Sequence, residues 1–114
     1  TIPLPGGYTS PERFIRAAYL KTHIPAPENS SAAVVSFFQI MKSVFIPKGA
    51  VMTTRCTDDY TQYTALIDLR TGEYFFHTYE NLQIRKVSFP AAAAPSAALN
   101  DLGKIVQPMI FEGL

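Results

Sequence analysis

The sequence predicts an α+β fold in which two helices precede a set of antiparallel strands. Two segments in the first half of the chain carry apolar residues at helical spacing, and proline-containing connectors follow both of them. Residues 52–89 are instead rich in β-branched and aromatic side chains, with a glycine at a central turn. A chain of 114 residues is the size of one small domain, so one hydrophobic core is the most that these elements could form.

The first helix is expected over residues 11–21. Residues 1–7 (TIPLPGG) form an extended lead-in, because its prolines cannot donate to a sheet and its glycine pair favours a turn. Ser10 is the expected N-cap, since Pro11 pushes the residue before it toward extended geometry and itself suits the first helical position.

The second helix is expected over residues 31–44 and is almost entirely apolar. Its polar residues Ser36, Gln39 and Ser43 lie on one narrow stripe. The whole chain is 47% hydrophobic and 17% charged, which is apolar for a domain that covers its own surface. Both observations indicate that a partner surface is missing.

The strands are expected after the second helix. A short strand over 52–55 comes first, and 60–69 and 73–80 then pair as a hairpin around the Arg70-Thr71-Gly72 corner. A third strand follows over 83–89. Residues 90–114 are expected to be a proline- and alanine-rich spacer and a docking tail.

Composition argues against several classes of partner and ligand. The formal net charge is +1 without a strongly basic or acidic stretch, so neither nucleic acid nor anionic lipid is an expected partner. No apolar run approaches the roughly 18 residues that a membrane span needs. Cys56 is the only cysteine, and with His23 and His77 it gives too few ligands for zinc. No metal or cofactor is therefore expected.

Arg13 is the candidate functional residue. It stands in the first turn of its helix, where the macrodipole disfavours a cation by a few tenths to ~1 kcal/mol. Glu12 and Arg16 have the favourable i, i+4 order and can pair with each other, which leaves Arg13 without a carboxylate on its own helix. Such an arginine could hold an anion or a thiolate, or it could be a solvated surface side chain.

Other chemically active residues have simpler interpretations. The PGGYTS loop has neither of the common phosphate-binding glycine patterns, so a turn and cap explain it. Cys56 has Arg55 beside it, but two nearby aspartates oppose activation of the thiol. His77 lies among aromatic residues of a strand and is expected to be packed or at an edge. Thr1 could be an amino-terminal nucleophile, but the prolines that follow remove amides that would hold it.

Three segments, in order, resemble the choloylglycine hydrolase and penicillin V acylase family of linear amide hydrolases, within the N-terminal-nucleophile hydrolase superfamily. They are PLPGGYTSPERFIRAAY, SFFQIMKSVFIPKGAV and YTQYTALIDLRTGEYFFHTYENLQIRKV, and they span most of residues 3–87. The first resembles the family's glycine-proline loop and Ser-Arg-Phe helix start. The third resembles its paired C-terminal strands, which end in Thr-Tyr-Asp-Asn.

The resemblance implies a four-layer αββα sandwich in which an amino-terminal cysteine thiolate attacks a linear amide. Residues 1–114 would then be the C-terminal segment of a single larger amide hydrolase domain, with the nucleophile upstream, and would be inactive alone. Of the family's catalytic positions only one maps onto this chain, at Arg13, an arginine that favours the thiolate and organises charge at the site.

Two departures from the family pattern lie close to Arg13. Glu12 replaces the usual small serine before the arginine, and Gly7 stands where an aspartate is common. Residues 90–114 match no recognised part of the family. If Glu12 paired with Arg13 rather than with Arg16, the assignment of a catalytic role to Arg13 would weaken.

The implied partners are the remaining N-terminal part of the same enzyme, a small-molecule amide substrate and further copies in a homo-oligomer of the full enzyme. Conjugated bile salts, penicillin V and N-acyl homoserine lactones are the implied substrate types. A periplasmic and a cytoplasmic bacterial location both remain open. The alternative is a stand-alone α+β binding or interaction module without catalysis, which would be monomeric, unfold cooperatively and bind no hydrophobic dye.

Overall fold

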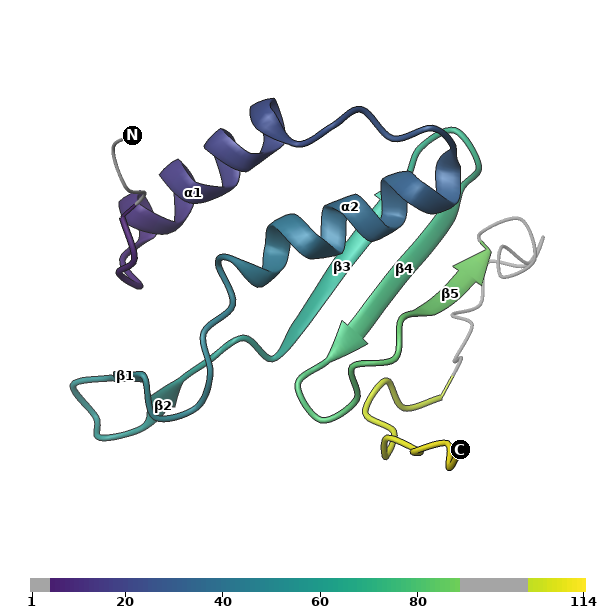
Figure 1. The fold of residues 1–114 in the computed structure, drawn as a ribbon. Helices are drawn as coiled ribbons and strands as arrows, with labels where there is room; N and C mark the ends of the chain where they lie inside the picture. The colour runs from purple at the N-terminus through teal and green to yellow at the C-terminus, as the bar shows by residue number, and fades with distance from the viewer. Residues whose placement is uncertain (1–4, 89–102) are drawn as a thin grey trace, which may run out of the picture. The chain divides into compact units, whose positions relative to one another are not determined.

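The computed structural model describes residues 5–88 and 103–114, and its element order confirms an α+β chain (Figure 1). The elements are α1 (Ser10–His23), α2 (Ser30–Lys42), β1 (Val51–Met52), β2 (Asp58–Asp59), β3 (Tyr63–Asp68), β4 (Glu73–Thr78) and β5 (Arg85–Ser88). They fall into two compact units, Thr1–Thr61 and Gln62–Leu114. Neither described helix combines the length and apolarity that a bilayer span requires.

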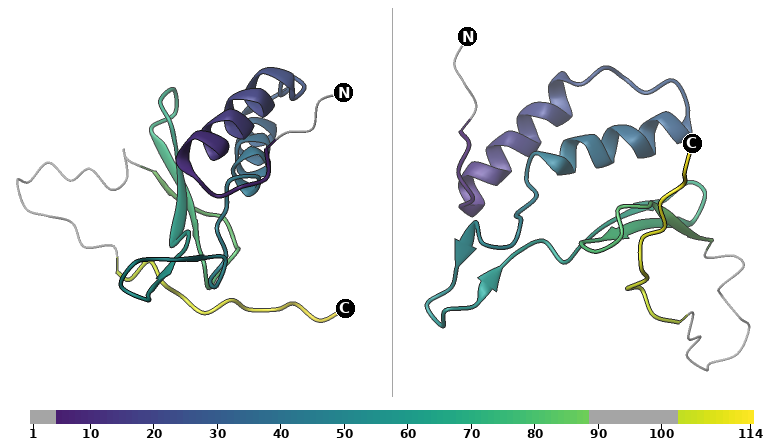
Figure 2. Two further views of the ribbon diagram at one scale, coloured as in Figure 1. Left: turned by 90° about the vertical axis from the view of Figure 1, so that its left-hand side faces the viewer. Right: turned by 60° about the horizontal axis from the view of Figure 1, so that its bottom comes forward.

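In the first unit, α1 and α2 lie side by side and run in opposite directions (Figures 1 and 2). Thr9, not Ser10, is the N-cap of α1: its backbone is extended and its Oγ1 accepts from the Glu12 amide at 3.4 Å. The predicted cap was one residue late, because Thr9-Ser10-Pro11-Glu12 has the spacing of a capping box and Pro11 is tolerated one position deeper in the first turn. The start of α1 therefore lies beside the end of α2.

The second helix ends earlier than its apolar pattern predicts. Asn29 caps its start, with Oδ1 accepting from the Ala32 amide at 2.8 Å. After Lys42 the chain tightens, and the Ser43 amide donates to the Ile40 carbonyl at 3.1 Å. The predicted end at residue 44 is thus two residues too late, and the carbonyls beyond the last helical residue are left to accept from other segments.

A two-stranded ribbon follows α2. Strands β1 and β2 pair antiparallel, with Val51 opposite Asp59 and Met52 opposite Asp58. The predicted strand over 52–55 is wrong beyond Met52, because residues 53–57 close a turn in which the Thr53 amide donates to the Thr57 carbonyl at 2.8 Å. Cys56 in this turn has a left-handed φ of 59°.

The second unit holds a three-stranded antiparallel sheet with the order β3-β4-β5 (Figure 1). Strands β3 and β4 form the predicted hairpin, paired from Asp68 opposite Glu73 to Tyr63 opposite Thr78. Gly72 has a φ of 70° and donates its amide to the Asp68 carbonyl at 2.9 Å, which closes the turn. The predicted third strand is present as β5. The spacer over 90–98 lies outside the described residues.

The two faces of this sheet differ in character, as the period-2 alternation of strands requires. Ile67, Tyr74, Phe76 and Val87 share one face, while Glu73 and Lys86 lie on the other. Lys86 Nζ lies 2.8 Å from Glu73 Oε2, and this hydrogen bond lowers the pKa of Glu73. The stabilisation that the pair provides is present at neutral pH and is lost as the pH falls through the lowered pKa of Glu73.

We expect Gly72→Ala to destabilise the hairpin by about 1–2 kcal/mol, because an L-residue at this φ brings its Cβ against the neighbouring carbonyl. Hydrogen exchange of the paired amides of β3 and β4 measures the change, because it reports the local stability of the hairpin. Gly113→Ala is the control, since a Cβ at position 113 has open space and the residue has no left-handed φ. Equal stability of the two variants would contradict the expectation.

Candidate functional site

The candidate site lies where α1 begins and α2 ends, and two arginines define it. Arg13 and Arg16 are one helical turn apart on the same side of α1. Arg13 Nε donates to the Val44 carbonyl at 2.9 Å, and Arg16 Nε donates to the Ser43 carbonyl at 2.8 Å. The two guanidinium groups thus bind consecutive carbonyls at the end of α2.

Arg16 is the more deeply placed of the two, with only 8% of its surface exposed. Its Nη1 donates to the Pro5 carbonyl and to the Gly7 carbonyl, each at 2.7 Å. Together with Ser43, three backbone carbonyls surround this cation, and no carboxylate within the described residues pairs with it. Backbone dipoles therefore replace water around a buried charge.

The predicted ion pair between Glu12 and Arg16 is wrong. Glu12 Oε1 instead accepts from the Thr9 hydroxyl at 2.6 Å, at the cap of its own helix. The local i, i+4 preference is worth only about 0.2–0.5 kcal/mol, so the cap and the carbonyl cage outweigh it. Because Glu12 is held at the cap, no ion pair to Arg13 forms either within the described part of the chain.

Arg13 is half-buried, so its side chain is neither fully solvated nor enclosed in the core. Its Nε is anchored on Val44, while Nη1 and Nη2 have no hydrogen-bond partner among the residues that the structure describes. The unfavourable dipole at the start of α1 is offset by the negative C-terminal end of α2, toward which the cation reaches. The guanidinium thus retains two nitrogens with which to bind an anionic or polar group.

The glycine loop before α1 offers carbonyls to Arg16 and does not form an amide cradle for phosphate, in agreement with its interpretation as a turn and cap. Gly7 has a second constraint: a Cβ at this position would lie 1.9 Å from Glu12 Oε2. The two departures from the family pattern are therefore linked in space, because the carboxylate of Glu12 occupies the volume that a side chain at position 7 would need.

The remaining candidates lie on other elements of the chain. Cys56 is exposed in the turn between β1 and β2, and His77 is half-buried on β4. Thr1 lies outside the described residues. Over residues 5–88 and 103–114, no group of three or more His, Cys, Asp and Glu side chains is placed to hold a metal. Arg16 was missed as a site residue; the available signal was that two arginines on one helix side each require an acceptor.

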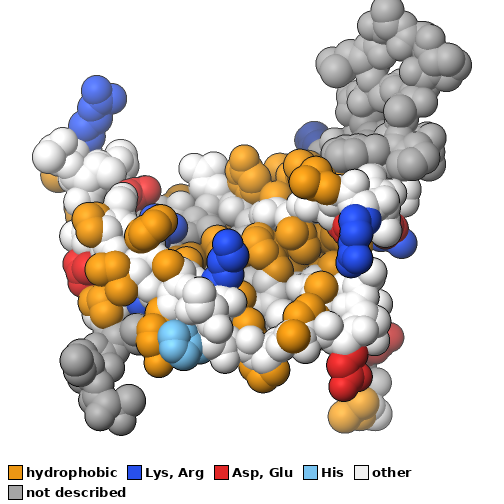
Figure 3. Space-filling view, turned by 90° about the horizontal axis from the view of Figure 1, so that it is seen from above, with side chains coloured by type: hydrophobic (Ala, Val, Ile, Leu, Met, Phe, Trp, Pro, Cys, Tyr) orange, Lys and Arg blue, Asp and Glu red, His pale blue; other side chains and the backbone are white. Residues whose placement is uncertain are grey.

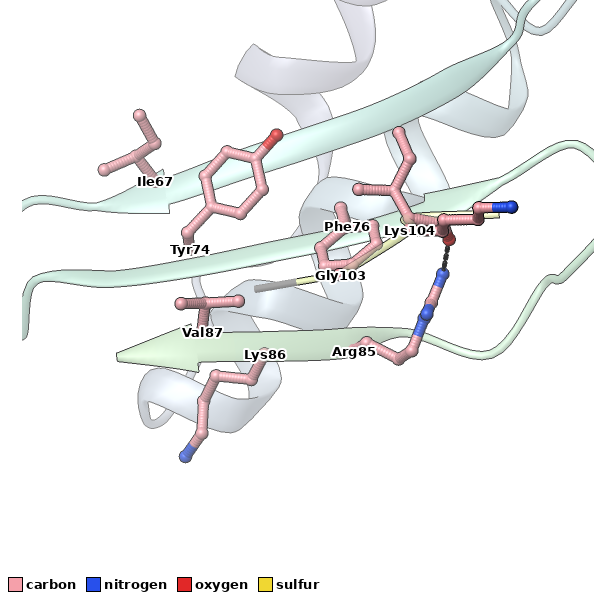
Figure 4. A pocket seen from close by; sticks show the side chains of 9 residues that line it. Ile67, Tyr74, Phe76, Arg85, Lys86, Val87, Gly103 and Lys104 are labelled. Atoms are coloured by element: carbon pink, nitrogen blue, oxygen red, sulfur yellow. Dashed lines mark hydrogen bonds between the residues drawn. The ribbon is translucent and has the colours of Figure 1, made fainter. Parts of the chain in front are cut away.

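The second unit carries a half-open apolar groove of about 460 Å³ (Figure 4). Tyr74, Phe76 and Val87 project from the sheet into it, and the segment Gly103–Ile105 lies along it. The Arg85 guanidinium stacks on Phe76, with Cζ 4.6 Å from the centre of the ring, and its Nη2 donates to the Ile105 carbonyl. Apolar side chains also appear among polar ones on the molecular surface in Figure 3.

Known amide hydrolases share this fold. The chain superposes with a TM-score of 0.75 on a variant of the conjugated bile acid hydrolase of Clostridium perfringens, at 28% identity, over 97% of this chain and 33% of that one. It superposes on the penicillin V acylase of Agrobacterium tumefaciens with a TM-score of 0.66, at 25% identity, over 77% of this chain and 28% of that one.

The chain belongs to the choloylglycine hydrolase family of linear amide C–N hydrolases, whose profile matches residues 1–99. It is 36% identical over 86 residues to the bile salt hydrolase/transferase of C. perfringens, covering 75% of this chain and 26% of that protein. It is 39% identical over 85 residues to the bile salt hydrolase/transferase of Lactiplantibacillus plantarum, with coverage of 75% and 26%. The chain thus spans about a quarter of the length of these relatives.

We expect Gly7→Ala to destabilise the chain by about 0.5–1 kcal/mol, because the new Cβ displaces the Glu12 carboxylate from its bond to Thr9. The same substitution in a Glu12→Ser background should cost almost nothing, since the shorter side chain leaves the space free. Hydrogen exchange of the amides of α1 in the four proteins of this double-mutant cycle gives the coupling. Additive effects of the two substitutions would show that the residues do not compete for this volume.

Proposed function

We propose that residues 1–114 are the C-terminal segment of a single larger amide hydrolase domain, and that the parent enzyme hydrolyses an amide between an acyl group and a small amine. The family match over residues 1–99 is the observation that carries this proposal. The names of the relatives support acyl amides as substrates, since they include bile salt hydrolases and a penicillin V acylase. Conjugated bile salts, penicillin V and N-acyl homoserine lactones are the proposed substrate types.

The proposed reaction uses an amino-terminal cysteine of the parent enzyme that lies outside residues 1–114. Its thiolate adds to the amide carbonyl carbon, and the C–N bond then breaks as the nitrogen takes a proton and leaves as the free amine. The acyl group remains on sulfur as a thioester. Water then adds to the thioester carbonyl, the C–S bond breaks, and the products are the carboxylic acid and the regenerated thiol.

Arg13 is the residue of this chain that we assign to the reaction. A guanidinium close to the cysteine lowers the pKa of the thiol by favouring the thiolate, and it stabilises charge that develops on the tetrahedral intermediate. The anchored Nε and the two Nη groups, which have no partner within residues 5–88 and 103–114, support this role, because the cation is held in place while two donors stay available. Arg16 cannot take the same part, since only 8% of its surface is exposed and its Nε and Nη1 are bound to backbone carbonyls.

The same proposal includes a four-layer αββα sandwich in the parent enzyme. The sheet face formed by Ile67, Tyr74, Phe76 and Val87 supports it, because Ile67 is 48% exposed there beside an apolar groove, and such a surface normally packs against another layer. Residues 90–114 would serve as a spacer and docking tail. The rest of the enzyme is then the main partner of this chain, joined covalently or as a separate polypeptide, within a homo-oligomer.

We expect Arg13→Ala in the full-length enzyme to lower turnover by about 10²–10³-fold without loss of folding, as for removal of one preorganised donor. Amine release from a glycine-conjugated bile salt, penicillin V and an N-acyl homoserine lactone measures both the activity and the preferred amide. Arg70→Ala is the matched control, since Arg70 is an exposed arginine of the hairpin turn. Unchanged turnover in Arg13→Ala would remove Arg13 from the catalytic assignment.

We expect the isolated chain of 114 residues to be inactive and to bind a hydrophobic dye. Phe14 is 74% exposed on α1, and Leu69 is 91% exposed at the end of the hairpin. Adding the N-terminal remainder of the enzyme as a separate polypeptide should abolish the dye signal and restore amide hydrolysis. A monomer that unfolds cooperatively and leaves the dye free would instead favour a stand-alone binding module.

A further inference from the structure

We infer that Arg16 is a positioning residue for Arg13: it holds the end of α2 and the glycine loop so that the Arg13 guanidinium is presented at a fixed place. The inference rests on the proposed function, since it concerns the residue to which that function assigns a catalytic role. Arg16 itself is not a candidate for contact with substrate. Only 8% of its surface is exposed, and both Nε and Nη1 are bound to backbone oxygens.

The carbonyls that accept from the two arginines belong to consecutive residues of the backbone. Arg16 binds the Ser43 carbonyl, and Arg13 binds the carbonyl of Val44, the next residue. Because each peptide unit is planar, only the φ and ψ of Val44 separate these two carbonyls. Val44 is itself buried, with 5% of its surface exposed, so its backbone has little room to adjust. A shift of the Ser43 carbonyl should therefore move the acceptor on which Arg13 rests.

The other end of the Arg16 side chain binds the loop that leads into α1. Nη1 donates to the carbonyls of Pro5 and Gly7, which lie on either side of Gly6. This loop immediately precedes Tyr8 and the cap residue Thr9, so its position sets where α1 begins. One buried side chain thus binds the lead-in to the end of α2 from within α1, the helix that carries Arg13.

Only an arginine can make this set of contacts. Nε and Nη1 are separate donors in one rigid plane, and they reach the Ser43 carbonyl and the loop carbonyls at the same time. A lysine carries the same charge on one nitrogen and cannot span both positions. Arg16→Lys therefore preserves charge and approximate size while it releases either the loop or the end of α2.

The test is a double-mutant cycle in the full-length enzyme with Arg16→Lys, Arg13→Ala and the double variant. We expect Arg16→Lys to lower kcat by about 10- to 100-fold with a much smaller change in KM, as for a misplaced catalytic group. In the Arg13→Ala background the same substitution should change kcat by less than about twofold, because the group that it positions is gone. Penicillin V and a glycine-conjugated bile salt are the probes.

Rates are referred to the concentration of folded sites, obtained by titration with a thiol-directed irreversible inhibitor in a Cys56→Ser background, because Cys56 is an exposed thiol that would also react. Arg70→Lys is the matched control and should match the wild-type enzyme. Wild-type kcat in Arg16→Lys, or an equal loss with and without Arg13, would overturn the inference. If Arg13→Ala itself has wild-type kcat, the proposed catalytic assignment fails first, which is a distinguishable result. Arg16→Gln replaces Arg16→Lys if the latter does not fold, and failure of both variants to fold would mean that Arg16 serves folding alone.

Discussion

The interaction on which the first unit depends is the binding of two arginines of α1 to backbone carbonyls at the end of α2. A buried cation is normally costly, and Arg16 has no carboxylate among the described residues to offset its charge. It is stabilised instead by three carbonyl dipoles, which are available because α2 ends at Lys42 and because the glycine loop turns its oxygens inward. The cation and the local backbone geometry thus require each other.

Much of the fold could be predicted from periodicity and turn chemistry. The helical spacing around residues 10–23 and the glycine at position 72 are local signals, and local signals decide helices and hairpins well. The errors arose where a few residues compete for one role. Thr9 is the cap instead of Ser10, and residues 53–57 form a turn where the β-branched Thr53 and Thr54 indicated a strand. The sequence pattern does not show which of several neighbouring residues will be the cap, or whether a short segment will form a turn or a strand.

The candidate site was only half predictable. Arg13 was identified because a cation at the start of a helix needs a reason to be there, and the Val44 carbonyl is part of that reason. This acceptor lies in a later helix, so no short-range rule could have named it. The pairing of Glu12 with Arg16 followed a sound local rule and was wrong, because tertiary contacts of a buried guanidinium are stronger than a solvated pair on a helix surface.

The closeness of position 7 to the Glu12 carboxylate makes the effects of substitutions at these two positions depend on each other. A side chain at position 7 must displace the end of the flexible Glu12 side chain from its bond to Thr9, whereas a change at position 12 needs no prior change at position 7. The order in which the two positions are replaced therefore changes the cost of each step. Any attempt to diversify this loop should vary the two codons together, since a library that randomises position 7 alone tests every side chain against the Glu12 carboxylate.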